Sequence, residues 1–270
     1  YENKIDTFFS TNGTLINKFA TQLAKINKHT FYLLSIDGGA ETNDYIRGKG
    51  ITDKIIKSIK ELEESCIKQK SGLPKLIVNY CVNEYNLEDI DNITSVAKEA
   101  GALTINYNLR WFLPEEKGVE YNKIIENEFK VTPTNTWTGW KTESKFEKIS
   151  EAIDKIYSKK NKLFPPYYTV MPRDLTSKQA KLFYTDYNEI FDLKSCIMPS
   201  YMVRIHSSGE MIYCPGYPDI VPGNVFNDDF KTIYLNKLST QLRKRVEKDL
   251  LPICNRCCGL YMTYSAKKYL

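Results

Sequence analysis

The stretch Phe31-Tyr32-Leu33-Leu34-Ser35-Ile36 is a nearly continuous apolar run, and it stops at Asp37-Gly38-Gly39. A short apolar run of this kind predicts a strand that is buried on both faces, as in a parallel sheet covered by helices. The acidic residue and the glycines that follow predict an abrupt end to the strand. The neighbouring sequence repeats the pattern, so this stretch decides the fold class.

Strands and helices alternate on both sides of this run. Apolar runs predict strands over 5–9, 75–82 and 103–107, and helical spacing predicts helices over 14–27, 51–68 and 87–100. This order predicts an α/β fold with a parallel sheet and right-handed crossover connections. Ligand sites in such folds lie at the carboxyl ends of the strands. Those ends here carry Thr11, Asn12, Ser35 and Asp37.

The middle of the chain is less regular. Residues 111–165 hold all three tryptophans (Trp111, Trp137 and Trp140) and are expected to bridge two parts of the fold. The aromatic side chains either cover an edge of the sheet or line a substrate opening. A polar helix is expected over 145–160, a strand over 167–171 and a helix over 176–190, where Thr176 and Gln179 have the spacing of a capping box.

The last third of the chain has a different pattern. Residues 201–206 and 210–213 flank Ser207-Ser208-Gly209, which predicts a β-hairpin. Gly223-Asn224-Val225 predicts a further turn, and an apolar stripe predicts one helix over 230–246.

Cysteines in this last third have the number and type of a metal site. The spacing is Cys196-x12-Gly209-x4-Cys214, followed by Cys254-Asn255-Arg256-Cys257-Cys258. Four thiolates suit an iron–sulfur cluster or a structural zinc ion, and they disfavour magnesium and calcium. The spacing alone leaves both metals open. Asp219 is a weak candidate for a base near this set, and the sequence identifies no catalytic residue.

Composition argues against several classes of protein. The chain has 270 residues, 42% hydrophobic and 26% charged, with a net charge of +5 and no apolar run long enough to span a membrane. Its densest basic stretch, Arg243-Lys244-Arg245, lies among acidic residues and indicates a solvated helix face rather than a nucleic-acid site. Seven cysteines, an odd number, indicate reduced thiols in the cytoplasm rather than a secreted disulfide framework.

Together these motifs resemble the radical S-adenosylmethionine (SAM) enzymes that carry a C-terminal SPASM or twitch domain. The barrel half contributes Thr11-Asn12-Gly13, Ser35-Ile36-Asp37-Gly38, Asp44-Tyr45-Ile46-Arg47-Gly48 and Asn86. The other half contributes the order of the cysteines, with Gly223-Asn224-Val225 and a helix between the two pairs.

The resemblance implies a fold and a set of cofactors. The fold is a partial (β/α) TIM-like barrel with parallel strands, followed by a small α+β cysteine-rich cluster domain. A [4Fe–4S] cluster reduces SAM, the resulting 5′-deoxyadenosyl radical takes a hydrogen atom from a peptide or small molecule, and flavodoxin or ferredoxin donates the electron. The enzyme is then of the oxidoreductase or maturase type.

The resemblance also assigns residues. Ser35 contacts SAM, Thr11 and Asn12 lie beside SAM or substrate, and Arg47 pairs with the SAM carboxylate. Asp37 orients either the loop or the ribose hydroxyls. One auxiliary [4Fe–4S] cluster is held by Cys196, Cys214, Cys254 and Cys257, with Cys258 as an alternate ligand, because no cysteine follows Cys258.

Two departures from the family pattern matter. The C-x3-C-x2-C motif that binds the SAM-cleaving cluster is absent, and Cys66 and Cys81, expected as buried small residues, cannot replace it. Since the chain begins at Tyr1, the expectation is an N-terminally truncated enzyme that does not cleave SAM alone. Sulfatase-maturing relatives place an acid where this chain has Pro215, which makes that substrate less favoured.

The expected domains are a barrel portion (1–145), a bridging segment (146–190) and a cluster domain (191–265). The alternative is a non-catalytic α/β binding module with a structural four-cysteine zinc site. A Rossmann-type nucleotide binder is disfavoured because no G-x-G-x-x-G follows a strand.

Overall fold

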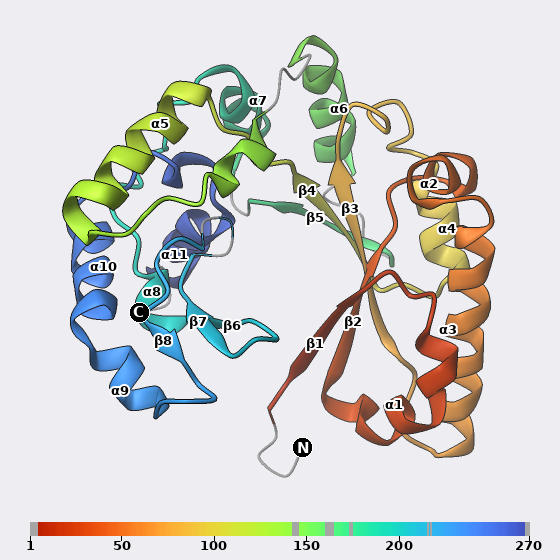
Figure 1. Cartoon of the computed structure of the whole chain (residues 1–270). Coiled ribbons are helices and arrows are strands. Elements are labelled where there is room, and N and C mark those ends of the chain that lie inside the picture. Colours follow the sequence, from red (N-terminus) through yellow and green to blue (C-terminus); the bar gives the residue numbers. More distant parts are fainter. Residues whose placement is uncertain are drawn as a thin grey trace. The chain divides into compact units, whose positions relative to one another are not determined.

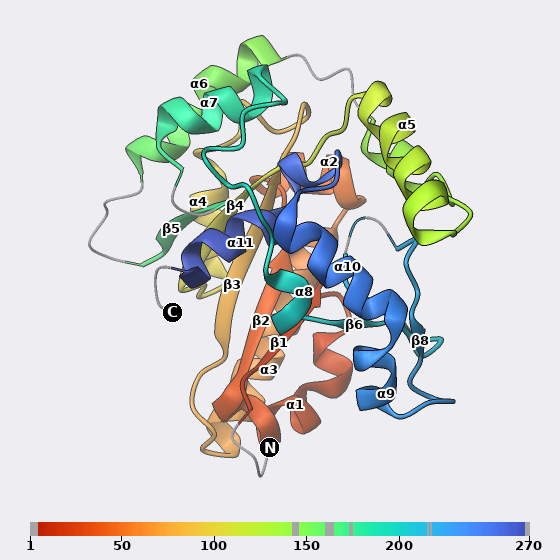
Figure 2. The same cartoon turned by 90° about the vertical axis from the view of Figure 1, so that its left-hand side faces the viewer.

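The computed structural model describes residues 5–141, 146–159, 165–172, 175–214, 216 and 218–267. The chain divides into two compact units. Unit 1 comprises Tyr1–Arg110 and Lys145–Met171, and unit 2 comprises Trp111–Ser144 and Pro172–Leu270. Figures 1 and 2 show the elements of both. The division expected from the sequence does not coincide with these units, and its boundary at 145 lies outside the described residues.

Unit 1 is built on a sheet of five parallel strands whose spatial order follows the chain. The strands are β1 (Thr7–Thr11), β2 (Thr30–Ser35), β3 (Lys75–Val82), β4 (Thr104–Leu109) and β5 (Tyr167–Met171). A sheet that never reverses its strand order is typical of a (β/α) barrel rather than of a doubly wound fold. The predicted parallel α/β architecture is confirmed.

Helices lie between these strands in the chain. They are α1 (Ala20–Ile26), α2 (Ala40–Arg47), α3 (Ile51–Lys68), α4 (Ile93–Glu99) and α6 (Phe146–Ser158). In Figure 1, α1 to α4 lie along one side of the sheet. The bounds of α3 are those that its apolar stripe predicts. The helix expected over 87–100 is shorter, because residues 84–92 form turns before α4 begins.

Burial differs between the two faces of the sheet. On β2, Tyr32 and Leu34 are buried, whereas Phe31, Leu33 and Ser35 are only partly buried. The prediction of a strand buried on both faces was therefore wrong, and the other face carries polar side chains. There Asn106 donates to Asn79 across neighbouring strands (3.0 Å), and Thr169 donates to Asn106 (2.9 Å).

Unit 2 combines short helices with a small antiparallel sheet. The helices are α5 (Glu115–Ile124), α7 (Ser177–Thr185), α8 (Met198–Tyr201), α9 (Phe230–Leu235), α10 (Lys237–Lys248) and α11 (Cys258–Lys267). The strands are β6 (Arg204–Ile205), β7 (Glu210–Ile212) and β8 (Gly223–Asn224). A π-helical turn (Ile125–Phe129) continues α5, and 3-10 turns cover Thr136–Trp140 and Cys254–Arg256.

Several local predictions for unit 2 needed correction. The hairpin is present, but Gly223–Asn224 is a third strand paired with β7 rather than a turn. The single helix expected over 230–246 is two helices, because Asn236 adopts an extended backbone and its side chain accepts from Ser239 N–H (2.9 Å) as the cap of α10. The capping box at Thr176 is present, and α7 ends earlier than expected.

Among the described residues, no helix is both long enough and apolar enough to cross a membrane.

The core under α3 supplies a stability prediction. Ile59 is 2% exposed on this helix, whereas Ile67 on the same helix is 63% exposed. We expect Ile59→Ala to lower the free energy of unfolding by about 2–5 kcal/mol, because it removes buried methyl groups and leaves a cavity. Ile67→Ala is the matched control and should change it by less than about 0.5 kcal/mol. Urea unfolding measures both, and equal losses would contradict the assigned burial.

Candidate functional site

The cysteines that the sequence singles out gather in the apolar core of unit 2. Cys254 is a buried member of this core, and Cys196 and Cys214 pack against it together with side chains such as Met211 and Val246. The backbone N–H of Cys196 donates to the carbonyl of Val246 on α10 (2.8 Å). All seven cysteines lie within the described residues, and none of them forms a disulfide bond. Packing of distant segments thus brings three thiols of the two predicted pairs into one core.

Burial governs the protonation of these thiols. It raises the pKa of Cys214 to about 12, with Cys196 and Asp219 adding to the shift. Burial likewise raises the pKa of Cys254 well above its usual value, and Cys214 and Cys196 raise it further. The mutual effects show that these sulfurs lie within electrostatic range of each other. A metal centre is the positive charge that lets buried thiols ionise and act as ligands.

Cys257 and Cys258 have different surroundings. Burial raises the pKa of Cys257 well above its usual value, and Cys258, Cys254 and Cys214 contribute as well. Burial also raises the pKa of Cys258, but Arg204 opposes the shift. Cys257 is therefore the thiol that is coupled to the rest of the set, whereas Cys258 begins α11 beside a cation.

The thiols are not close enough to one another to share a metal ion in this structure. In the part of the chain that the structure describes, no group of three or more His, Cys, Asp or Glu side chains is placed to hold a metal ion. A tetrahedral zinc ion would need its sulfurs within about 4 Å of each other, because each Zn–S bond is about 2.3 Å. A four-iron cluster separates its thiolates further. The donor type and burial fit a thiolate-ligated cluster, and binding requires the sulfurs to approach.

Arg256 holds the loop between Cys254 and Cys257. Its side chain is 1% exposed and donates to the backbone carbonyls of Glu189 (3.1 Å), Asn255 (2.8 Å) and Asp186. Its guanidinium also lies over three aromatic rings, those of Phe112, Phe183 and Tyr187, at 4.7–5.4 Å from their centres. The sequence analysis missed this residue. The feature of the sequence that would have indicated it is an arginine between the two cysteines of the C-x2-C motif.

Asp219 anchors the loop that follows Cys214. Its carboxylate accepts from the hydroxyl of Tyr121 (2.6 Å) and from both the backbone N–H (2.6 Å) and the hydroxyl (2.7 Å) of Thr134. Both carboxylate oxygens are engaged, which argues for a structural role over the predicted role as a base. Pro215, where relatives carry an acid, lies outside the described residues.

Two tryptophans of segment 111–165 support the loop that follows Cys214. Trp140 donates its indole N–H to the carbonyl of Gly216 (3.3 Å) and packs on Trp111, with ring centres 5.2 Å apart. A Cβ at Gly216 would come within 2.8 Å of the Trp111 ring, so a larger residue there would require the ring to shift. Trp137 is buried against Gly118 and donates to Asn122 (3.0 Å).

In unit 1, the predicted SAM-contacting residues end two adjacent strands. Thr11 of β1 pairs with Leu34 of β2, one residue before Ser35. The Thr11 hydroxyl accepts from Gly13 N–H (3.1 Å), and the Asn12 side chain accepts from Thr14 N–H (3.1 Å). The parallel register therefore brings Thr11, Asn12 and Ser35 to the same edge of the sheet.

Asp37 is the hub of the loop after β2. Its Oδ1 accepts from Cys81 N–H at the end of β3 (2.9 Å), and its Oδ2 accepts from Arg47 Nη2 (2.6 Å). Asn86, fully buried, donates to the Asp37 carbonyl (3.0 Å), and Asn43 accepts from the Asp37 N–H (2.9 Å). Of the two predicted roles for Asp37, these contacts favour orientation of the loop.

Arg47 has a buried donor without a partner. Its Nη2 is bonded to Asp37, but its Nε–H is buried and has no hydrogen-bond partner in the described structure. An orphaned guanidinium N–H fits the carboxylate of a bound ligand. Cys66 is buried as expected, whereas Cys81 is exposed, because it lies on the face of β3 without a helical cover.

Sequence reasoning also missed the polar face of the sheet. Asn79, Asn106 and Asn108 alternate with buried apolar residues on β3 and β4. An asparagine at every second position of a buried strand is the signal that would have indicated a polar inner surface.

Comparison with known proteins agrees with this geometry. Residues 196–258 match the SPASM family, an iron–sulfur cluster-binding domain. The AdoMet-dependent heme synthase of Methanosarcina barkeri (strain Fusaro / DSM 804) is 24% identical over 229 residues, which cover 84% of this chain and 59% of the relative. The chain thus spans about three fifths of that protein.

Solved structures show the same fold. Streptococcus suis SuiB bound to S-adenosylmethionine matches with a TM-score of 0.59 and 17% identity, covering 96% of this chain and 56% of SuiB. Native anSMEcpe with bound AdoMet and Kp18Cys peptide matches with a TM-score of 0.52 and 15% identity, covering 100% of this chain and 74% of anSMEcpe. The resemblance to radical SAM enzymes with a SPASM domain is confirmed.

The contacts of Arg256 generate a prediction. Arg256→Met should lower the free energy of unfolding by about 1–3 kcal/mol, because it leaves buried carbonyls without donors. Arg110→Met is the control, since Arg110 makes a partly exposed ion pair with Glu84 (3.0 Å) that contributes about 0–1 kcal/mol. Urea unfolding compares the two. A loss no greater for Arg256→Met than for Arg110→Met would show that this side chain does not hold the loop.

Proposed function

We propose that this chain contributes the SAM site and one auxiliary [4Fe–4S] cluster to a radical SAM enzyme that takes a hydrogen atom from a peptide. One observation carries the proposal: cysteine side chains from distant segments, none of them in a disulfide, lie in or against one apolar core of the region that matches the SPASM domain. The parallel sheet of unit 1, with its polar strand ends, supports a SAM site.

The proposed cluster ligands are Cys196, Cys214, Cys254 and Cys257. Electrostatic coupling of Cys257 to Cys254 and Cys214 favours it over Cys258, which remains the alternate ligand. The surrounding apolar side chains exclude water and strengthen the attraction between thiolates and metal. The hydrogen bonds of Asp219 and Arg256 hold the two cysteine loops without using any thiol.

The proposed SAM contacts are Ser35, Thr11, Asn12 and Arg47, with Asp37 as the residue that holds the loop. When bound, SAM and a reducing cluster supply the hydrogen-abstracting chemistry. The chain's own residues bind and orient: the Asp37 carboxylate accepts from Arg47 Nη2 at 2.6 Å and so holds the guanidinium that would pair with the ligand carboxylate. Because the sequence contains no C-x3-C-x2-C motif, we propose that these residues alone do not cleave SAM.

A peptide is the proposed substrate. SuiB has been solved with its precursor peptide SuiA, with a TM-score of 0.55 to this chain, and anSMEcpe has been solved with a peptide. The Methanosarcina relative is named a heme synthase, so a small molecule is the second candidate. A flavodoxin or ferredoxin is the proposed electron donor, and the cytoplasm is the proposed location.

The metal content of the chain tests the proposal. After reconstitution without oxygen, we expect about four iron and four sulfide per chain and a brown absorbance, as thiolate-ligated clusters give. About one zinc per chain, colourless and without sulfide, would instead indicate a structural four-thiolate site. That result would remove the auxiliary cluster and leave the radical SAM assignment on fold likeness alone.

The ligand assignment has a matched test among the cysteines. Cys214→Ala should abolish most iron binding, because it removes one of the coupled thiols. Cys66→Ala, a buried cysteine on α3 in unit 1, should leave iron binding unchanged. Iron and sulfide analysis after reconstitution measures both variants, and equal iron retention in the two would exclude the proposed ligand set.

A further inference from the structure

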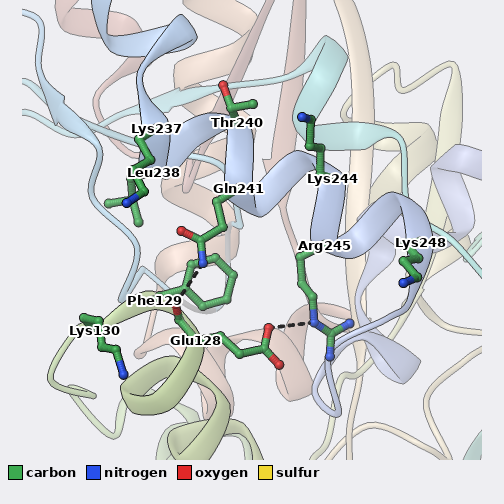
Figure 3. A pocket seen from close by; sticks show the side chains of 10 residues that line it. All are labelled: Glu128, Phe129, Lys130, Lys237, Leu238, Thr240, Gln241, Lys244, Arg245 and Lys248. Carbon is green, nitrogen blue, oxygen red and sulfur yellow. Dashed lines mark hydrogen bonds and ion pairs between the residues drawn. The ribbon is translucent and has the colours of Figure 1, made fainter.

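A basic cleft lies on unit 2, and none of its lining residues has a role in the proposed cluster or SAM site. It measures about 900 Å³ and is formed by the π-helical turn and by α10. Its lining residues, which Figure 3 shows, are Glu128, Phe129, Lys130, Lys237, Leu238, Thr240, Gln241, Lys244, Arg245 and Lys248. A hollow of this volume is in the range of specific ligand sites.

Hydrogen bonds hold the two walls of the cleft together. Gln241 donates to the backbone carbonyl of Glu128 (2.8 Å), and Arg245 Nε donates to the Glu128 carboxylate (2.9 Å), as the dashed lines in Figure 3 mark. The π-helical turn ends at Lys130, whose backbone is left-handed with φ 58°. Turns of this kind occur often at functional sites. The cleft is therefore preformed.

The charge of the lining is strongly one-sided. Glu128 is its single acid, and Arg245 neutralises it while also pairing with Asp249 (3.1 Å). Four lysines remain, Lys130, Lys237, Lys244 and Lys248, and none of them makes an ion pair with another residue in the described ranges. Such a lining attracts a ligand with several negative charges.

The base of the cleft is apolar. Phe129 is 6% exposed and belongs to the core of unit 2, and Leu238 packs against the same core. A ligand that fits must therefore combine carboxylates with an apolar group. Single-stranded nucleic acid is less suitable, because Phe129 is the only aromatic lining residue and is too buried for a base to stack on it.

The basic stretch at residues 243–245 is divided between two tasks. Lys244 and Arg245 line the cleft. Arg243 instead lies over the ring of Tyr234 (4.1 Å) and donates to the hydroxyl of Tyr213 (2.9 Å). The sequence predicts that this stretch forms a solvated helix face. In the structure, Lys244 and Arg245 form one wall of the cleft, and Arg243 packs against tyrosine side chains.

We propose that this cleft binds an acidic peptide segment. An apolar side chain of the peptide packs on Leu238 at the base of the cleft, and flanking carboxylates lie beside Lys237 and Lys244, which are about two turns apart on the same face of α10. The site requires neither SAM nor a metal cluster, so it stands or falls separately from the proposed function.

Fluorescence anisotropy with the full chain tests the proposal. The probe is a fluorescein-labelled peptide of sequence Glu-Glu-Leu-Glu-Glu-Leu-Glu-Glu. The variant Lys237→Glu/Lys244→Glu should weaken binding by at least about tenfold, since it reverses two charges beside the ligand. The control Lys178→Glu/Lys231→Glu makes the same charge change at exposed lysines outside the cleft and should change binding by less than about twofold.

Changes in the peptide probe test the apolar base and the lysine lining of the cleft separately. Replacing both leucines of the peptide by serine should weaken binding by about tenfold if the apolar base is used, and replacing every glutamate by lysine should abolish binding. Equal weakening by the two protein variants would overturn the proposal. The proposal would also be overturned if a single-stranded RNA of equal charge bound more tightly than the peptide. It would be overturned as well if neither protein variant weakened peptide binding.

Discussion

Burial of cysteine thiols is the constraint on which the C-terminal half of this molecule depends. A protonated thiol behaves as a small apolar group and packs well, as Cys254 does in the core of unit 2. A thiolate in the same place requires a neighbouring positive charge. Around the set, both carboxylate oxygens of Asp219 accept from protein donors, and two nitrogens of Arg256 donate to backbone carbonyls, whereas Arg256 Nε has no partner in the described structure.

In unit 1 the buried group that needs partners is a carboxylate rather than a thiol. Asp37 is buried, and each of its oxygens has a donor, from Cys81 N–H and from Arg47. These contacts fix the loop after β2 against the end of β3. They also hold in place a guanidinium whose buried Nε–H has no partner in the described structure. A ligand carboxylate would then meet a group whose position is set before binding, which lowers the entropic cost of binding.

Both units use hydrogen bonds to place the loops that carry their proposed ligand-binding groups. In unit 2, Trp140 and Gly216 place the loop after Cys214, and in the basic cleft Gln241 and Arg245 place the π-helical turn. One chemical kind of side chain gathers at each proposed site. Cysteines gather at the proposed cluster, and lysines line the cleft.

The sequence by itself determined the parallel α/β unit, most strand bounds, the helix Ile51–Lys68 and the match to a cysteine-rich cluster domain, because periodicity and motif spacing are local. Tertiary structure alone decided which face of the sheet is covered, that Asn236 breaks a helix, and that Arg256 and Asp219 hold loops. These depend on partners distant along the chain, such as Glu189 for Arg256 and Tyr121 for Asp219, which no local pattern encodes.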